Sequence, residues 1–273
     1  MPINAGFIGY GNIAGKIIRC NDFSVNKKQD ILFYDHIIGL RDTIPTSIST
    51  IKGDGGDKNS ITKYNPQAMF YRYGTYIYQG GFTFPLTSNC ASLLWEEARG
   101  GKNFDSEFFY GCKDVVTYSN CKVNSYNLKI ANGDVVTSSI DIIARSSNLS
   151  SSIHSLNTTS EVLLKWTDVS IKFDNTIVTD LANLEFTINN SCIPIYTANT
   201  LEAGSIRVGI QRLSGIVSSY GALSSFPSKI EIKIGNSFST TLNVLWKPTE
   251  KSASVGALIL QNPFVGNIYN IIV

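Results

Sequence analysis

The feature that most constrains the fold is a strict alternation of apolar and polar residues in two neighbouring stretches, 169–173 and 184–188. A period of two places successive side chains on opposite faces of a strand, so each stretch has one apolar and one polar face. Turn-forming pairs of Asp and Asn follow both stretches. We therefore predict two half-buried strands that pair with each other and need a second layer over their apolar face. The apolar positions are Val169, Ile171, Phe173, Leu184, Phe186 and Ile188.

Two hairpins and several other strands are predicted along the chain. Residues 121–145 contain Asn132-Gly133, which favours a tight reversal between strands. Residues 230–246 contain a comparable turn at Gly235-Asn236. Further strands are expected at 16–25, 68–84 and 206–213. The fold class is therefore mainly β.

One helix is predicted between residues 88 and 100. Thr87 or Ser88 can cap its start, and Gly100-Gly101 can end it. Adjacent carboxylates at Glu96 and Glu97 could serve acid–base chemistry, but a solvated helix face explains them without any further assumption. The apolar stripe consists of Ala91, Leu94, Trp95 and Ala98.

A stretch rich in Ser, Thr and Asn, residues 146–160, is the best candidate for a domain boundary. The order of predicted elements after it resembles the order before it, which suggests an internal duplication. We therefore expect an N-terminal β domain at 1–147, a linker at 148–160 and a C-terminal β domain at 161–273. Each would be a β-sandwich or partial barrel with a short helix packed on its sheet.

The opening stretch allows a different interpretation. Residues 6–15 contain the pattern G-x-G-x-x-A, and Asp35 ends an apolar run that could be a second strand, as in a dinucleotide-binding enzyme. However, residues 21–26 alternate like a strand where that fold needs a helix, and no series of alternating β and α elements follows. We favour a Gly-rich N-terminal arm that leads into the strand at 16–25.

The residues that could bind metals or perform catalysis are few. Asp54 and Asp57 lie in a long polar segment, 39–65, and lack the full set of calcium ligands, so an intersubunit loop is favoured. His36 and His154 are far apart in the sequence and have no further ligands at usable spacing. The five cysteines have no Cys-x-x-Cys spacing and are expected to be reduced thiols: Cys20, Cys90, Cys112, Cys121 and Cys192.

Composition points toward an assembly. Charged residues make up 16% of the chain, against about 25% in typical proteins, which suggests that surface is buried between subunits. The formal net charge is +2 with no basic block of the kind that binds phosphates. No run of 18 apolar residues predicts a membrane span, and the first residues do not look like a secretory signal.

Three stretches together resemble the core of phage tail tube proteins: 167–171, 181–190 and 206–215, the last containing Leu213-Ser214-Gly215. Residues 122–126, Gly133 and 136–139 also resemble the closing strands of that domain. The resemblance implies a structural subunit of stacked rings around a DNA-conducting channel. It implies no enzyme activity, no catalytic, cofactor-binding or metal-binding residues and no cofactor.

The resemblance also implies partners and a location. Copies of the chain would join by their sheet edges, with sheath, tape-measure and baseplate proteins as further partners and DNA passing without specific recognition. The protein would be assembled in the host cytoplasm and belong to the tail of the virion, without membrane insertion. Ring-to-ring contacts are expected from the Gly-rich N-terminus, residues 53–57 and residues 268–273.

Ring symmetry follows from the number of tube domains in the chain. Rings in this family are typically sixfold with one domain per subunit, so two domains predict a homotrimer with pseudo-sixfold symmetry. If only the second half is a tube domain, the ring is a hexamer. The alternative function is a β-sandwich binding module of the tail, a glycan-binding adhesin or hub component, for which tyrosines such as Tyr71 and Tyr73 could form a platform.

Overall fold

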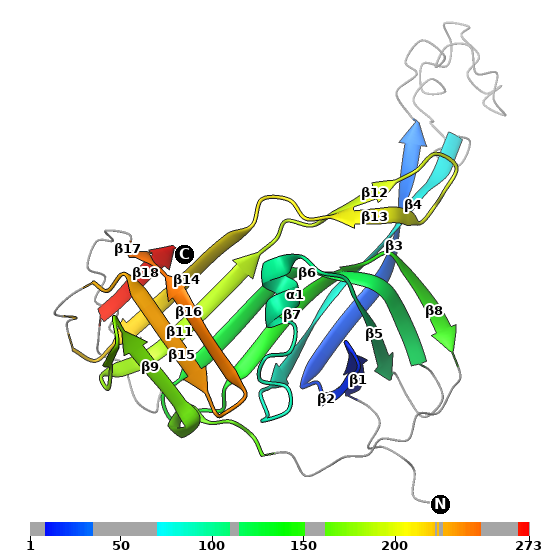
Figure 1. Cartoon of the computed structure of the whole chain (residues 1–273). Helices are drawn as coiled ribbons and strands as arrows, with labels where there is room; N and C mark the ends of the chain where they lie inside the picture. Colours follow the sequence, from blue (N-terminus) through cyan, green and yellow to red (C-terminus); the bar gives the residue numbers. More distant parts are fainter. Residues whose placement is uncertain are drawn as a thin grey trace, which may run out of the picture. The chain divides into compact units, whose positions relative to one another are not determined.

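The computed structural model describes residues 9–34, 70–109, 115–150, 162–221, 223, 226–246 and 267–272 (Figure 1). These residues form a mainly β structure with sheets of twelve, four and two strands. Contacts divide the chain into two units, one made of Met1–Lys27 and Ile77–Val273 and the other of Lys28–Tyr76. The second unit contains the paired outer halves of β3 and β4, where the Gln29 Nε2 donates to the Gly74 carbonyl at 3.3 Å.

The elements follow the chain in this order: β1 (Tyr10–Ile13), β2 (Lys16–Arg19), β3 (Asp22–Tyr34), β4 (Phe70–Pro85), α1 (Trp95–Gly100), β5 (Phe104–Phe109), β6 (Val115–Ala131), β7 (Thr137–Ala144), β8 (Ser146–Ser150), β9 (Val169–Phe173), β10 (Thr176–Ile177), β11 (Leu181–Asn189), β12 (Ile193–Tyr196), β13 (Ala203–Arg207), β14 (Arg212–Ser219), β15 (Lys229–Ile234), β16 (Phe238–Asn243), β17 (Leu245–Trp246) and β18 (Asn267–Ile272).

The large sheet is organised around β6, which is 17 residues long. Along one side of β6 the chain pairs first as β7 and then as β8. Along the other side β11 pairs with the end of β6, and β5 pairs with its beginning. The sheet therefore forks along β6, with β14, β18 and β17 continuing beyond β11 and with β1 and β2 continuing beyond β5.

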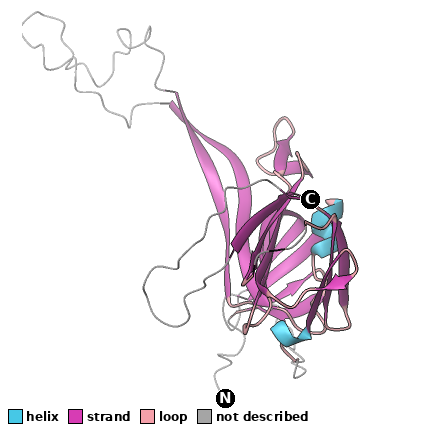
Figure 2. Cartoon of the chain, turned by 90° about the vertical axis from the view of Figure 1, so that its left-hand side faces the viewer, coloured by secondary structure: helices cyan, strands magenta, loops and turns pink. Residues whose placement is uncertain are grey.

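The small sheet, in the order β10-β9-β15-β16, forms the second layer over the β11 part of the large sheet. The indole of Trp95 lies between the layers, with its ring centroid 5.4 Å from Tyr126 in β6 and 5.4 Å from Phe238 in β16. Figure 2 shows the layers from the side. The core is a sandwich in which alternate residues of both sheets point inward.

The prediction that the two alternating stretches pair with each other is wrong. β9 pairs with β10 and β15 in the small sheet, whereas β11 pairs with β6 and β14 in the large sheet. The apolar rows are buried as expected, with Ile171 and Phe173 on one side of the core and Phe186 on the other. Alternation defines which face of a strand is buried but carries no information about its neighbour.

The boundary expected at 148–160 is not where the described chain separates. β6 of the first half pairs with β11 of the second half over seven registered positions, so both halves contribute to one sheet. The start of the expected linker, β8, is a strand paired with β6. Residues 151–161 lie outside the described residues. Long-range strand pairing, which leaves little local signal in the sequence, thus links the two sides of the expected boundary, and the division into two tandem domains stays a prediction.

The helix is shorter than predicted. Helix α1 begins after Leu94, whose φ of 58° places it in the left-handed region, and it ends at Gly101 as expected. Thr87 does not cap the helix, because its backbone pairs with Leu163 and its hydroxyl contacts the Cys90 sulfur at 3.1 Å. In the second half, the described residues contain only a short 3-10 turn, Trp166–Asp168, in place of the expected helix.

Both predicted hairpins are confirmed, as β6–β7 and β15–β16. The strand expected at 16–25 is divided into β2 and β3. The start of the G-x-G pattern is not a phosphate-binding loop, because Tyr10–Ile13 is a strand paired with β2 and β5 and no helix follows it. This pairing rules out the dinucleotide-binding interpretation for the described residues, while residues 1–8 and Asp35 lie outside them.

Candidate assembly surface

The face of the large sheet that points away from the core is polar. Its side chains come from the half-exposed positions that alternate with buried ones in β6, β7 and β11. The Asn127 Nδ2 in β6 donates to the Glu185 Oε1 at 2.6 Å and to the Thr187 Oγ1 at 3.0 Å, both in β11. The outward positions include Thr83, Asn124, Ser125, Asn127, Lys129, Thr137, Ser139, Asp141, Glu185, Thr187 and Ser214.

Carboxylates on this polar face are bound by neutral groups. The Asn124 Nδ2 donates to the Asp141 Oδ2 at 2.9 Å. The charge of Glu185 is also balanced by Lys129, which is its register partner on β6. Within the described ranges, the one ion pair shorter than 4 Å lies on the small sheet, between Lys172 and Glu231 at 3.8 Å. The polar face therefore presents hydroxyls, amides and a few balanced charges, and has no concentration of cations that could hold phosphates.

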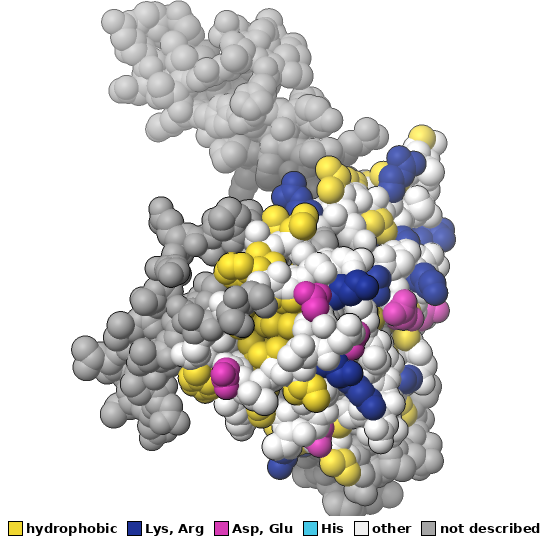
Figure 3. Space-filling model, turned by 60° about the vertical axis from the view of Figure 1, so that its left-hand side comes forward, with side chains coloured by type: hydrophobic (Ala, Val, Ile, Leu, Met, Phe, Trp, Pro, Cys, Tyr) yellow, Lys and Arg dark blue, Asp and Glu magenta, His cyan; other side chains and the backbone are white. Residues whose placement is uncertain are grey.

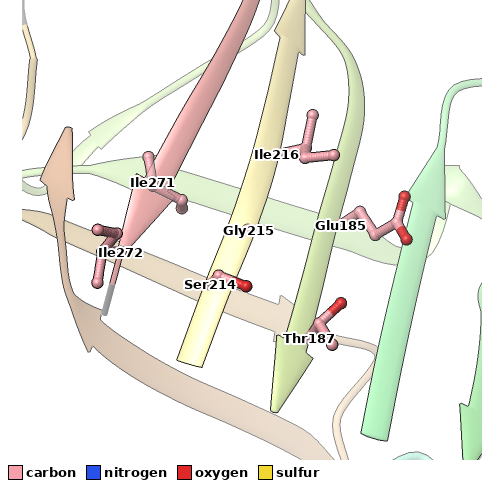
Figure 4. A pocket seen from close by; sticks show the side chains of 7 residues that line it. All are labelled: Glu185, Thr187, Ser214, Gly215, Ile216, Ile271 and Ile272. Carbon is pink, nitrogen blue, oxygen red and sulfur yellow. The ribbon is translucent and has the colours of Figure 1, made fainter. Parts of the chain in front are cut away.

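The polar face ends in an apolar edge, which we define as Ile216, Leu245 and Ile272. Their side chains are 37%, 75% and 43% exposed. Leu245 is the register partner of Ile272, and among the described residues β17 pairs with only two residues of β18, so the rest of that strand edge has no described neighbour. Figure 4 shows Ile216 and Ile272 beside Glu185, Thr187 and Ser214 around a shallow hollow over β11, β14 and β18. Exposed apolar side chains beside an open edge are typical of contact surfaces.

The C-terminus of α1 fills the fork in the large sheet. The side chain of Asn190, which is fully buried, donates to the carbonyls of Ala98 and Val123, both at 2.8 Å. The Gln211 Nε2 donates to the Ala98 carbonyl at 3.0 Å and to the Asn190 Oδ1 at 2.8 Å. These two amides satisfy helix carbonyls that have no partner inside the helix, and so they fix α1 to the sheet.

The two strands β12 and β13 form a hairpin arm between β11 and β14. Asn190 and Gln211 lie at the base of this arm, just after β11 and just before β14. Two further hydrogen bonds hold the arm near the start of β13. The Tyr78 hydroxyl donates to the Glu202 Oε1 at 2.9 Å, and the Arg145 Nε donates to the Ala203 carbonyl at 3.0 Å. Ile193 of the arm remains 56% exposed. Sequence reasoning assigned Asn190 to a turn and did not identify Gln211, because a sequence does not show which amides meet the carbonyls at a helix end.

The four cysteines that the structure describes lie in the interior. Cys20, Cys90, Cys121 and Cys192 are buried free thiols, and burial raises the pKa of Cys20 and of Cys121 to about 12. A thiol with so high a pKa carries no nucleophilic thiolate near neutral pH.

The other candidates fall partly inside and partly outside the described residues. Glu96 is exposed on α1, and Tyr78 is buried rather than part of an open platform. His36, Asp54, Asp57, Cys112 and His154 lie outside the described residues, as do the side chains of Tyr71 and Tyr73. In the described part of the chain, no three His, Cys, Asp or Glu side chains converge as metal ligands. No helix there is long and apolar enough to cross a membrane.

Comparison with known proteins agrees with this picture of a β-rich structural protein. The family model described as phage tail tube protein matches residues 50–266 as a single region, well over half of the chain. No curated protein matches the sequence. The single match spans the expected boundary at 148–160, as does the shared sheet. The chain belongs to the phage tail tube protein family and is a structural component of a phage tail.

Proposed function

We propose that the chain is the subunit of a tube of stacked rings, and that the polar face of its large sheet lines the channel. The observation that carries the proposal is the hydrogen bonding of Asn127 to Glu185 and of Asn124 to Asp141. These carboxylates are bound by neutral amides, and basic side chains are few. DNA phosphates are therefore neither strongly attracted to the polar face nor strongly repelled by it. DNA then passes through the tube without being recognised.

The apolar edge of Ile216, Leu245 and Ile272 supports lateral contact between subunits. An open strand edge offers unpaired backbone groups to a strand of a neighbouring copy, and the exposed side chains beside it gain burial in the same contact. The sheets of neighbouring copies thereby continue into one wall.

We infer a ring of six copies rather than three. The trimer required two tube domains in each chain. β6 and β11 instead join the two halves in one sheet, and one family match covers both halves. One domain per chain in a typically sixfold family gives a hexamer. Sheath, tape-measure and baseplate proteins are further expected partners, assembly takes place in the host cytoplasm, and no step is enzymatic.

Electron microscopy of the purified protein tests the ring and its symmetry, and thiol labelling tests which face lines the channel. In a Cys112→Ser background, Lys129→Cys places a thiol on the polar face, while Lys233→Cys places one on the outer face of the small sheet. In assembled tubes, a small maleimide should label both, and a maleimide on a large polymer should label only Lys233→Cys. Equal labelling by the large reagent in tubes would show that the polar face does not line the channel.

A further inference from the structure

We propose that copies of the chain join head to tail through two oppositely charged surfaces at opposite ends of the large sheet. One surface surrounds Ile210, and it docks on the surface around Tyr220 of a second copy. This inference rests on the proposed self-assembly and specifies one of its contacts.

The Ile210 surface consists of one apolar side chain and exposed cations at the foot of the hairpin arm. Ile210 is 72% exposed. The Gln211 Nε2 donates to the Arg99 carbonyl at 3.1 Å, which brings the end of α1 beside the start of β14. Glu97 on the same helix is the nearby carboxylate, and none of the cations forms an ion pair with a described residue. The surface is defined as Arg99, Lys102, Arg207, Ile210 and Arg212.

On the face drawn in Figure 3, basic side chains are more frequent at this end of the molecule. Figure 3 shows Lys and Arg side chains gathered mainly over the upper part of the described surface, with fewer below. The arm leaves the large sheet at this upper end (Figure 1).

The Tyr220 surface has the opposite charge. Tyr220 is 52% exposed, and its backbone N–H donates to the Asp180 carbonyl at 2.9 Å. The Asn132 Nδ2 donates to its hydroxyl at 3.4 Å, which brings the β6–β7 turn with Asp134 to the same end. The Trp166 N–H donates to the Asp134 carbonyl at 3.0 Å and adds the segment containing Asp168. Lys165 in this segment and Lys233, whose register partner Ser170 lies two residues from Asp168, are cations beside these three exposed carboxylates.

β14 connects the two surfaces directly, since it runs from Arg212 to Ser219. Eight residues at about 3.3 Å each place the surfaces roughly 26 Å apart, at opposite ends of one strand. One copy cannot satisfy its own two surfaces, and two unlike patches that pair between copies generate a ring or an open polymer. Each surface combines an exposed apolar centre with a charged rim, which is the usual arrangement of a contact between proteins.

Charge reversal at each end separately tests this contact. Arg99→Glu with Arg212→Glu makes both ends acidic, and Asp134→Lys with Asp180→Lys makes both ends basic. Neither variant should form sedimenting tubes alone at concentrations where wild type does, and an equimolar mixture should form them. The matched control, Lys172→Glu with Lys229→Glu, makes the same change in charge on the outer face of the small sheet, toward the other end of β9 and β15, and should assemble like wild type.

The outcomes separate this contact from the proposed function. A milder pair, Arg99→Gln with Arg212→Gln, should raise the critical concentration for assembly about tenfold, since exposed ion pairs are individually weak. Melting curves establish that each variant is folded. If wild type forms tubes and both reversed variants also form them alone, or if the mixture does not assemble, the contact is wrong. If wild type forms no ring or tube, the proposed function fails and this contact with it.

Discussion

Gly215 in β14 lies directly opposite Phe186 in β11, and the phenyl ring occupies the space that a side chain at Gly215 would need. A Cβ built at Gly215 would be 2.8 Å from the Phe186 Cδ1 and 2.7 Å from the Glu185 carbonyl oxygen. The ring thereby covers the glycine within the core. This pairing explains physically why a glycine ends the strand motif that resembles tail tube proteins.

Gly215→Ala should lower the free energy of unfolding by about 1–3 kcal/mol, because the new methyl group would overpack against Phe186 and the adjacent backbone. Urea denaturation of the unassembled protein measures the change. Gly221→Ala is the matched control, since a Cβ there would meet no atom within 4 Å. Equal stability of the two variants would contradict the close packing.

Asn190→Ala should destabilise the protein by about 2–4 kcal/mol, because the buried Val123 carbonyl loses its amide donor and the Ala98 carbonyl keeps only that of Gln211. The measurement is again urea denaturation, accompanied by limited proteolysis of the hairpin arm, which should become faster. Asn243→Ala removes the same amide from an exposed position and should change stability by less than about 0.5 kcal/mol. If the two variants lose the same free energy of unfolding, the hydrogen bonds of Asn190 do not stabilise the position of α1.

Trp95→Ala should cost about 3–5 kcal/mol, because Trp95 contacts both layers of the sandwich. Trp95→Phe should cost much less, since it keeps an aromatic ring and removes an indole N–H that has no hydrogen-bond partner. Calorimetry of both variants checks the order. The layers do not depend on Trp95 if the alanine variant melts at the wild-type temperature.

Cys20 and Cys121 should resist thiol reagents in the native protein at pH 8, since burial keeps each protonated with a pKa near 12. Denaturation should expose five reactive thiols per chain, the number in the sequence.

Alkaline pH should also lower stability. The unfolded state releases its thiol protons from about pH 9 upward, before the folded state does, so the free energy of unfolding falls as pH rises through that range. Urea midpoints measured between pH 8 and pH 10.5 test this dependence, with Cys121→Ala reducing its slope. A slope unaffected by that substitution would mean that the buried thiol does not contribute.

The sequence by itself determined the mainly β class, the two hairpins and the buried faces of two strands. Alternation in 169–173 and 184–188 defined two buried rows, and Asn132-Gly133 located a hairpin, because these signals depend on residues close together in the chain. Strand residues arranged as in tail tube proteins also indicated the family. The odd number of cysteines without paired spacing agreed with the four buried free thiols.

Tertiary structure alone decided which strands far apart in the sequence are neighbours, and where Asn190 and Gln211 bind the end of α1. β9 and β11 carry the same pattern but belong to opposite layers, and β6 joins with β11 across the expected domain boundary. Asn190 and Gln211 can donate to the carbonyls of α1 only because β11 and β14 place them at the end of that helix. Alternation specifies the buried face of a strand equally well for any partner, so partner choice depends on how all the strands pack together, which no single stretch of the chain encodes.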